Sequence, residues 1–143
     1  MVRYFTQDKV FSFKNRKINS EWIKKVISEQ SRSAGFSLGD INIIFCSDPF
    51  ILELNNKYLK HNYFTDIITF DNSQGNLISG DLYISIDTVK SNAKEYSVTF
   101  ENELHRVIIH GILHLLGYDD KTKDQSNVMK EMENKCLNMR DIG

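Results

Sequence analysis

The sequence predicts an α+β fold, in which a small mixed sheet of about four strands packs with about five helices in a three-layer α/β arrangement. Strand-like and helix-like segments are interspersed along the 143 residues, and one late helical segment is apolar on nearly every face. The composition is that of a globular chain, with 41% hydrophobic and 26% charged residues. Chains of this length usually form one domain, so we expect residues 1–143 to be a single domain that folds without disulfide bonds.

The N-terminal third contains the least regular patterns. Apolar residues cluster or alternate in Val2–Phe5 and Val10–Phe13, which predicts two short strands. Asn19 or Ser20 is a suitable N-cap for the following helix, because both side chains can accept a hydrogen bond from a free backbone N–H group. Apolar residues at helical spacing then extend this helix to about Ser33.

The middle of the chain alternates between the two types of element. Ser47, Asp48 and Pro49 predict a helix start, since Ser or Asp can cap the helix and Pro favours its first position. This helix carries apolar residues as far as Leu59. The other expected elements are strands at Ile41–Cys46, Thr65–Phe70 and Leu77–Ile86, a turn at Asp71–Gly75, and a helix at Asp87–Tyr96.

The helical segment after Thr99 differs from all the others. From Leu104 to Leu116 its apolar residues cover almost the whole helix surface, and such a helix belongs in the interior of a protein. Gly117 follows at the position that glycine favours after a helix C-terminus. A last helix is expected over Lys123–Arg140.

Charge and cysteine content restrict the class of protein. The net charge of −1 argues against bulk nucleic-acid binding, although basic residues gather in the first third of the chain. Cys46 and Cys136 form no CxxC pair, so we expect free thiols in a reduced cytosol. No apolar run approaches about 18 residues, and the N-terminus lacks a continuous apolar stretch. These features predict a cytoplasmic protein that does not enter a membrane.

The sequence HGILHLLGYDD, residues 110–120, carries the most specific chemical signal. His110 and His114 are four residues apart, so on a helix they lie about 40° apart on one face. Gly117 then lets the chain turn back, so that Asp119 or Asp120 can supply a third ligand. Two histidines and one carboxylate, with water in a fourth position, form a known catalytic zinc site. The alternative is that hydrogen bonds alone satisfy both imidazoles.

One residue argues against a peptidase. The metallopeptidase pattern H-E-x-x-H has a glutamate beside the first histidine as general base. Gly111 occupies that position here. A metal could still lower the pKa of a bound water, but the proton acceptor of a peptidase is missing.

Four other polar residues have weaker signals. His105 lies about 140° around the helix from His110, so we expect a surface or hydrogen-bonded histidine outside the site. His61 either contacts phosphate or, as is more usual for a lone loop histidine, is solvated. Asp66 and Asp81 fall in or beside strands, where each either braces the metal site or makes a structural turn hydrogen bond.

These residues resemble a known family, the YbeY endoribonucleases, which are bacterial metalloproteins associated with the ribosome. His110–Asp119 fits every fixed position of the family's helix motif, H-G-x-L-H-L-x-G-Y-D-H. Two further blocks resemble the family pattern in the same order along the chain: Leu54-Asn55-Asn56-Lys57-Tyr58 followed by Thr65-Asp66-Ile67-Ile68-Thr69-Phe70, and then Gly80-Asp81-Leu82-Tyr83-Ile84-Ser85.

The chain departs from this pattern at two positions. Asp120 stands where the family has its third histidine, which identifies Asp120, rather than Asp119, as the expected third ligand. A carboxylate can still bind zinc. We expect the bound metal to be a weaker Lewis acid and the site to accept a wider range of metals. Leu59 stands where the family has an arginine that contacts phosphate, so Lys57 or Lys60 is expected to take over phosphate binding.

The resemblance implies a metal-dependent hydrolase that cleaves single-stranded RNA. Its expected roles are maturation of the 3′ end of small-subunit ribosomal RNA and ribosome quality control, with the ribosomal small subunit as partner. One Zn²⁺ ion or another divalent metal, held by His110, His114 and Asp120, would activate a water for attack on the phosphodiester. Two alternatives remain open. One is a metal-dependent peptidase or other hydrolase, and the other is a non-enzymatic ribosome-assembly factor stabilised by its metal.

Overall fold

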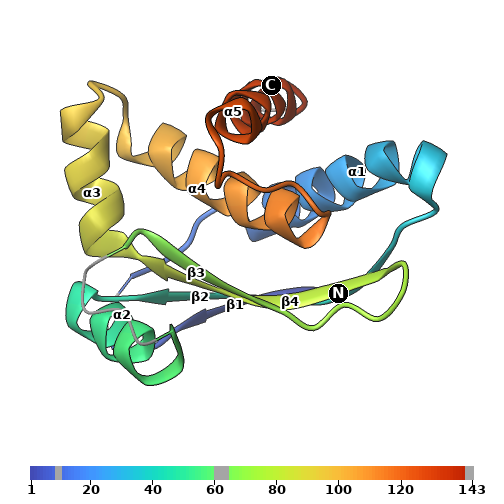
Figure 1. Cartoon of the computed structure of the whole chain (residues 1–143). Coiled ribbons are helices and arrows are strands. Elements are labelled where there is room, and N and C mark those ends of the chain that lie inside the picture. Colours follow the sequence, from blue (N-terminus) through green and yellow to red (C-terminus); the bar gives the residue numbers. More distant parts are fainter. Residues whose placement is uncertain (9–10, 60–64, 141–143) are drawn as a thin grey trace.

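A four-stranded sheet forms the base of the fold in this computed structural model, which describes residues 1–8, 11–59 and 65–140 (Figure 1). The strands are β1 (Val2–Thr6), β2 (Ser37–Cys46), β3 (Ile67–Asp71) and β4 (Leu77–Ser85). Their order in the sheet is β1-β2-β4-β3. The pairs β1–β2 and β2–β4 are parallel, and β3 pairs antiparallel with β4 at one edge. The predicted mixed sheet is therefore confirmed.

Helices cover the two faces of this sheet unequally. They are α1 (Arg16–Ala34), α2 (Asp48–Leu54), α3 (Ile86–Glu95), α4 (Phe100–Leu115) and α5 (Lys123–Asn138). Figure 1 shows α1, α3, α4 and α5 on one side of the sheet and α2 on the other. In the same view α4 lies between the sheet and α5, so the chain builds the expected three-layer α+β fold around a central helix.

The alternation of side chains along the strands decides which face carries the main core. Ile41 and Ile43 of β2, and Leu82 and Ile84 of β4, all point to one face and are fully buried. They join the apolar residues of α1 and α4 in one core cluster. The prediction that α4 belongs in the interior is confirmed, because nine of its residues are buried.

The predicted start of α1 is wrong. The helix begins at Arg16, one turn before the expected cap, so Asn19 lies inside it and is completely buried. The Asn19 amide donates to the carbonyl oxygens of Lys14 and Asn15 and accepts a hydrogen bond from Arg140 Nε at 3.0 Å. The asparagine therefore joins two ends of the chain, a tertiary role that its local sequence does not reveal.

The strand expected over Val10–Phe13 is not formed by Phe11–Phe13, while Val10 lies outside the described residues. The rings of Phe11 and Phe13 instead pack at 5.0 and 4.9 Å from the ring of Phe45 on β2. The apolar pattern therefore marks a loop that fills the core rather than a strand that pairs with a neighbour.

The helix expected to continue to Leu59 changes its geometry after Leu54. Ser47 caps α2 as predicted, since its side chain accepts a hydrogen bond from the Phe50 N–H group. The residues Asn55–Leu59 then form a π-helical turn, η1. Such turns are rare and often found at functional sites.

Two further expectations concern thiols and membranes. Both Cys46 and Cys136 are buried free cysteines, as predicted. Within the described residues, no helix combines the length and the apolar character needed to span a membrane.

Candidate metal centre

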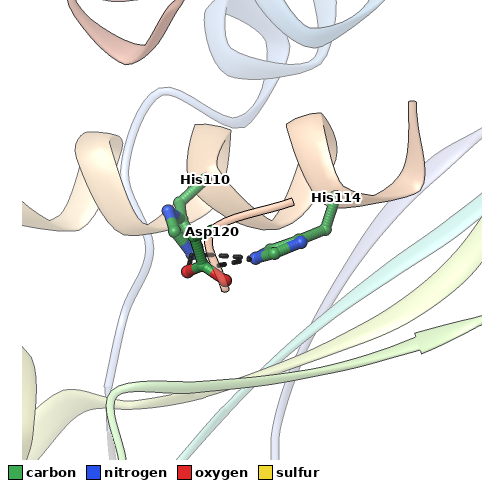
Figure 2. Close-up of side chains that lie close together, drawn as sticks. All are labelled: His110, His114 and Asp120. Carbon is green, nitrogen blue, oxygen red and sulfur yellow. Dashed lines mark hydrogen bonds and ion pairs between the residues drawn. The ribbon is translucent and has the colours of Figure 1, made fainter. Parts of the chain in front are cut away.

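Helix α4 positions the two histidines. Thr99 caps it by accepting a hydrogen bond from the Asn102 N–H group at 3.1 Å. One turn separates His110 from His114, and both rings project from the same side of α4 (Figure 2). Their Nε2 atoms lie 3.0 Å apart, and about a quarter of each side chain is exposed. The spacing has therefore produced two imidazoles that converge on one point.

The chain reverses after α4 through a Schellman motif. Gly117 has a φ of 102°, a value that a residue with a Cβ rarely adopts. The N–H group of Gly117 donates to the carbonyl of His114, and that of Tyr118 donates to the carbonyl of Leu113, both at 3.0 Å. The Tyr118 hydroxyl also donates to Gln30 on α1 at 3.0 Å. The direction of the outgoing chain is thus fixed.

A capping box at the start of α5 fixes the other end of this turn. The Thr122 hydroxyl accepts a hydrogen bond from the Gln125 N–H group, and the Gln125 side chain accepts one from the Thr122 N–H group. Between the two anchors, Asp120 turns back toward α4. Its Oδ2 atom lies 3.3 Å from His110 Nε2 and 3.6 Å from His114 Nε2 (Figure 2).

The separations between these three donor atoms fit a divalent metal ion. Ligand atoms about 2.05 Å from the centre of a tetrahedron lie about 3.3 Å from one another. The observed separations are 3.0, 3.3 and 3.6 Å. His110, His114 and Asp120 are also the three residues that the described part of the chain brings together as a possible ligand group. Three protein ligands leave the fourth position of a tetrahedral site open.

A second carboxylate contacts the outer nitrogen of His110. Glu133 on α5 is buried, with 6% of the whole residue exposed. Its Oε2 atom lies 2.6 Å from His110 Nδ1. Its other oxygen accepts a hydrogen bond from Arg106 Nη1 at 2.9 Å. Burial by itself lowers the pKa of His110, but the hydrogen bond and charge of Glu133, together with Asp120 and Asp66, raise it above its ordinary value.

The charges around His110 favour a cationic occupant. Asp66, Glu103 and Glu133 all lie near one another, with Arg106 as a nearby cation. Burial raises the pKa of the Asp66 carboxyl, and His110 partly offsets this. Burial also raises the pKa of Glu103, and the Asp66 charge raises it further. We call the three donor atoms of His110, His114 and Asp120 the donor triangle. A divalent cation bound there would relieve this repulsion between carboxylates.

The donor triangle lies in the wall of an open cavity of about 660 Å³. Helix α4 contributes the histidines, whereas Asp66 lies in the chain immediately before β3. Lys121, next to Asp120, also lines the cavity. Lys121 was not among the phosphate ligands predicted from the sequence, although its place beside Asp120 in the turn is a usable signal.

Lys57 and Lys60 are the two lysines that the sequence predicts to bind phosphate. Lys57 is exposed on η1, with its Nζ 5.2 Å from the centre of the Tyr58 ring, and is not among the described residues that line the cavity. Lys60 and His61 lie outside the described residues. Among described lysines, Lys121 is therefore the one that the structure brings to the donor triangle.

The structure decides between the alternatives for Asp81 and agrees with the expectation that His105 lies outside the site. Asp81 does not brace the site: it lies on the opposite face of β4 from Leu82 and accepts a hydrogen bond from Asn42 at 2.9 Å. His105 does lie outside the site, but its ring packs edge-on against Trp22 at 5.9 Å instead of lying free on the surface. Burial, with a contribution from Arg140, lowers the pKa of His105 to about 4.

Comparisons with known proteins place these residues in a family context. The family model described as endoribonuclease YbeY matches residues 4–141. A relative from Bacteroides thetaiotaomicron named endoribonuclease YbeY is 50% identical over 139 residues, which cover 97% of this chain and 98% of the relative. One of the same name from Porphyromonas gingivalis is 48% identical over 124 residues, covering 87% of this chain and 80% of the relative.

A solved structure has a similar fold. The solution structure of TM1509 from Thermotoga maritima matches with a TM-score of 0.66 and 29% sequence identity, covering 97% of this chain and 88% of that chain. The family match includes the α4 histidines, the turn that returns Asp120 and the α5 glutamate behind His110. The chain therefore belongs to the endoribonuclease YbeY family.

Proposed function

We propose that this protein is a metal-dependent endoribonuclease that hydrolyses single-stranded RNA in the cytoplasm. Its proposed role is maturation of the 3′ end of small-subunit ribosomal RNA and quality control of the small subunit. The observation that carries the proposal is the triangle of donor atoms from His110, His114 and Asp120 in a cavity wall. The relatives that bear the name endoribonuclease support the choice of RNA as substrate.

The donor set favours zinc, although another divalent ion can accept the same ligands. When bound, the ion supplies Lewis acidity at the scissile phosphate and lowers the pKa of a water molecule. The protein's contribution is to hold the two Nε2 atoms and one carboxylate oxygen at fixed separations. The Schellman motif and the capping box on either side of Asp120 provide this rigidity.

Lys121 and Asp66 line the same cavity and suit the binding of phosphate and the transfer of a proton. The Lys121 ammonium group attracts the phosphate and offsets its developing negative charge. The Asp66 carboxylate on this cavity wall is our candidate to accept a proton from the attacking water. Because backbone phosphates provide much of the affinity, RNA binding should weaken as salt concentration rises.

Packing around Gly111 disfavours the H-E-x-x-H arrangement of a metallopeptidase. A Cβ atom at this position would lie 2.7 Å from Cδ1 of Ile67 and 3.0 Å from Cδ2 of Leu82. A glutamate beside His110 would therefore require the side-chain ends of Ile67 and Leu82 to move aside. A peptidase would therefore need another acid near the metal in place of the general base of the H-E-x-x-H pattern.

The test compares cleavage and metal content in matched histidine variants. The substrate is a single-stranded oligonucleotide with the sequence of the small-subunit ribosomal RNA 3′ end, alone or annealed to its complement. We expect His114→Ala to lose the metal and cleavage of the single strand. His105→Gln is the control, since it removes a histidine from the same helix but outside the cavity, and should retain both.

The outcomes separate the three functions. Full cleavage by metal-free His114→Ala protein would refute the proposed mechanism. Turnover of peptides without turnover of RNA would favour the peptidase. A folded wild-type protein that binds metal and small subunits, melts at a lower temperature after metal removal, and cleaves neither substrate would identify an assembly factor.

A further inference from the structure

Glu133 connects the candidate metal centre to the outer layer of the fold. It projects from α5 toward α4, with 8% of its side chain exposed, and both of its oxygens are engaged. Oε2 lies 2.6 Å from His110 Nδ1, and Oε1 lies 2.9 Å from Arg106 Nη1. Arg106 and His110 are one turn apart on α4, so they meet the carboxylate from the same side. Arg106 also donates to Asn134 at 2.8 Å, which ties it to the same helix as Glu133.

The direction of these hydrogen bonds follows from the groups involved. A guanidinium group only donates, and an ionised carboxylate only accepts. His110 must therefore donate its Nδ1–H to Glu133, and in the neutral ring this leaves the lone pair on Nε2. Nε2 is the atom that lies 3.3 Å from Asp120 and 3.0 Å from His114 Nε2. The hydrogen bond on one side of the ring thus prepares the other side as a metal ligand.

We propose that Glu133 is a positioning residue of the metal centre, which holds His110 as the Nδ1–H tautomer with Nε2 facing the metal, and that Arg106 fixes the orientation of Glu133. The inference rests on the proposed function only in that the site binds a divalent metal. Glu133 itself does not touch metal or RNA. Outer carboxylates of this kind typically change metal affinity by 10–100-fold when they are replaced.

A glutamine at position 133 provides a sharp test because it has nearly the same shape. Its amide has one acceptor and one donor group, whereas the carboxylate has two acceptors. Arg106 can only donate, so it holds the amide oxygen of the Glu133→Gln side chain. The amide NH₂ group then faces His110 and favours the tautomer with hydrogen on Nε2, which cannot bind a metal.

A positioning role for Glu133 predicts a rescue of metal binding that a purely structural role does not. Arg106→Met in the Glu133→Gln background frees the amide to rotate and to present its oxygen to His110 Nδ1. The double variant should therefore bind metal better than Glu133→Gln alone. If Glu133 only stabilises the packing of α5 on α4, the additional loss of Arg106 should weaken metal binding further.

The experiment measures Zn²⁺ affinity by competition with a chromophoric chelator in the folded, full-length protein. We expect Glu133→Gln to weaken binding by about 10–100-fold. Adding Arg106→Met should recover most of that loss. Glu131→Gln, which removes an exposed carboxylate from the same helix, is the control and should bind as the wild type does.

A second readout needs neither metal nor activity. Long-range ¹⁵N–¹H NMR spectra of the metal-free protein, recorded at a pH high enough for the ring to be neutral, distinguish the two tautomers of His110. We expect hydrogen on Nδ1 in the wild type and on Nε2 in Glu133→Gln. The proposal is overturned if the wild-type ring carries its hydrogen on Nε2, if Glu133→Gln binds Zn²⁺ as tightly as the wild type, or if Arg106→Met deepens the loss. A wild-type protein that binds no divalent metal would instead refute the metal centre itself.

Discussion

Replacement of Gly111 by alanine tests how closely the histidine helix packs against the sheet. Alanine in the interior of a helix normally stabilises it by about 1 kcal/mol relative to glycine. Here the new methyl group would meet Ile67 Cδ1 at 2.7 Å and two Leu82 methyl groups at 3.0 and 3.1 Å. Overpacking of a core typically costs about 1–3 kcal/mol, so we expect a net destabilisation of about 1 kcal/mol. For a chain of this size that lowers Tm by about 3 °C.

The assay is thermal unfolding of metal-free protein, followed by circular dichroism. Ile67→Val supplies the matched background because it removes Cδ1, the atom closest to the new methyl group. In that background Gly111→Ala should be neutral or stabilising. A rise in Tm on introducing Gly111→Ala into the wild type would refute the reasoning, since helix propensity would then outweigh any clash. Ile67 and Leu82 would then also leave room for a larger side chain beside His110.

Three further predictions concern the ligand set, acid stability and the turn that carries the third ligand. Elemental analysis should find bound metal in Asp119→Ala but not in Asp120→Ala, because Asp120 lies with the histidines. Burial lowers the pKa of His105 to about 4, below the value of about 6.5 for the unfolded chain. The unfolded state therefore takes up more protons as pH falls from 6.5 to 4, and stability should decline in that window by about 1–2 kcal/mol after allowance for partial exposure. Urea unfolding should show a flatter pH dependence for His105→Phe, which keeps a ring at this position. Thr122→Ala should lower the free energy of unfolding by about 1 kcal/mol and weaken metal binding, because the Gln125 capping box fixes one end of the Asp120 turn.

The parts of the fold that follow from local rules could be predicted from the sequence. The burial of α4 follows from its apolar surface, and the start of α2 follows from its serine cap and proline. The convergence of His110 and His114 follows from helix periodicity alone. Gly117 marked the reversal because few other residues adopt a φ of 102°.

The sequence did not reveal features that depend on distant contacts. Asn19 has the local features of a helix cap, but Arg140, more than a hundred residues later, makes it a buried connector inside α1. Glu133 lies 23 residues after His110, and no spacing rule joins them. The face of the sheet on which Asp81 lies could have been predicted, because the two-residue period of β4 puts it opposite Leu82.

Negative charge around the site implies that metal binding and RNA binding are coupled. Asp120 adds a carboxylate to a region that already holds Asp66 and Glu133, with Arg106 already paired to Glu133. These carboxylates repel a phosphate that approaches the metal-free site, and Lys121 on the cavity wall offsets this repulsion only in part. A bound divalent cation reverses the sign of this interaction. By linkage, RNA must then strengthen metal binding by the same factor as metal strengthens RNA binding. The coupling should be larger here than in a site with a third histidine, because the carboxylate leaves more negative charge for the cation to neutralise.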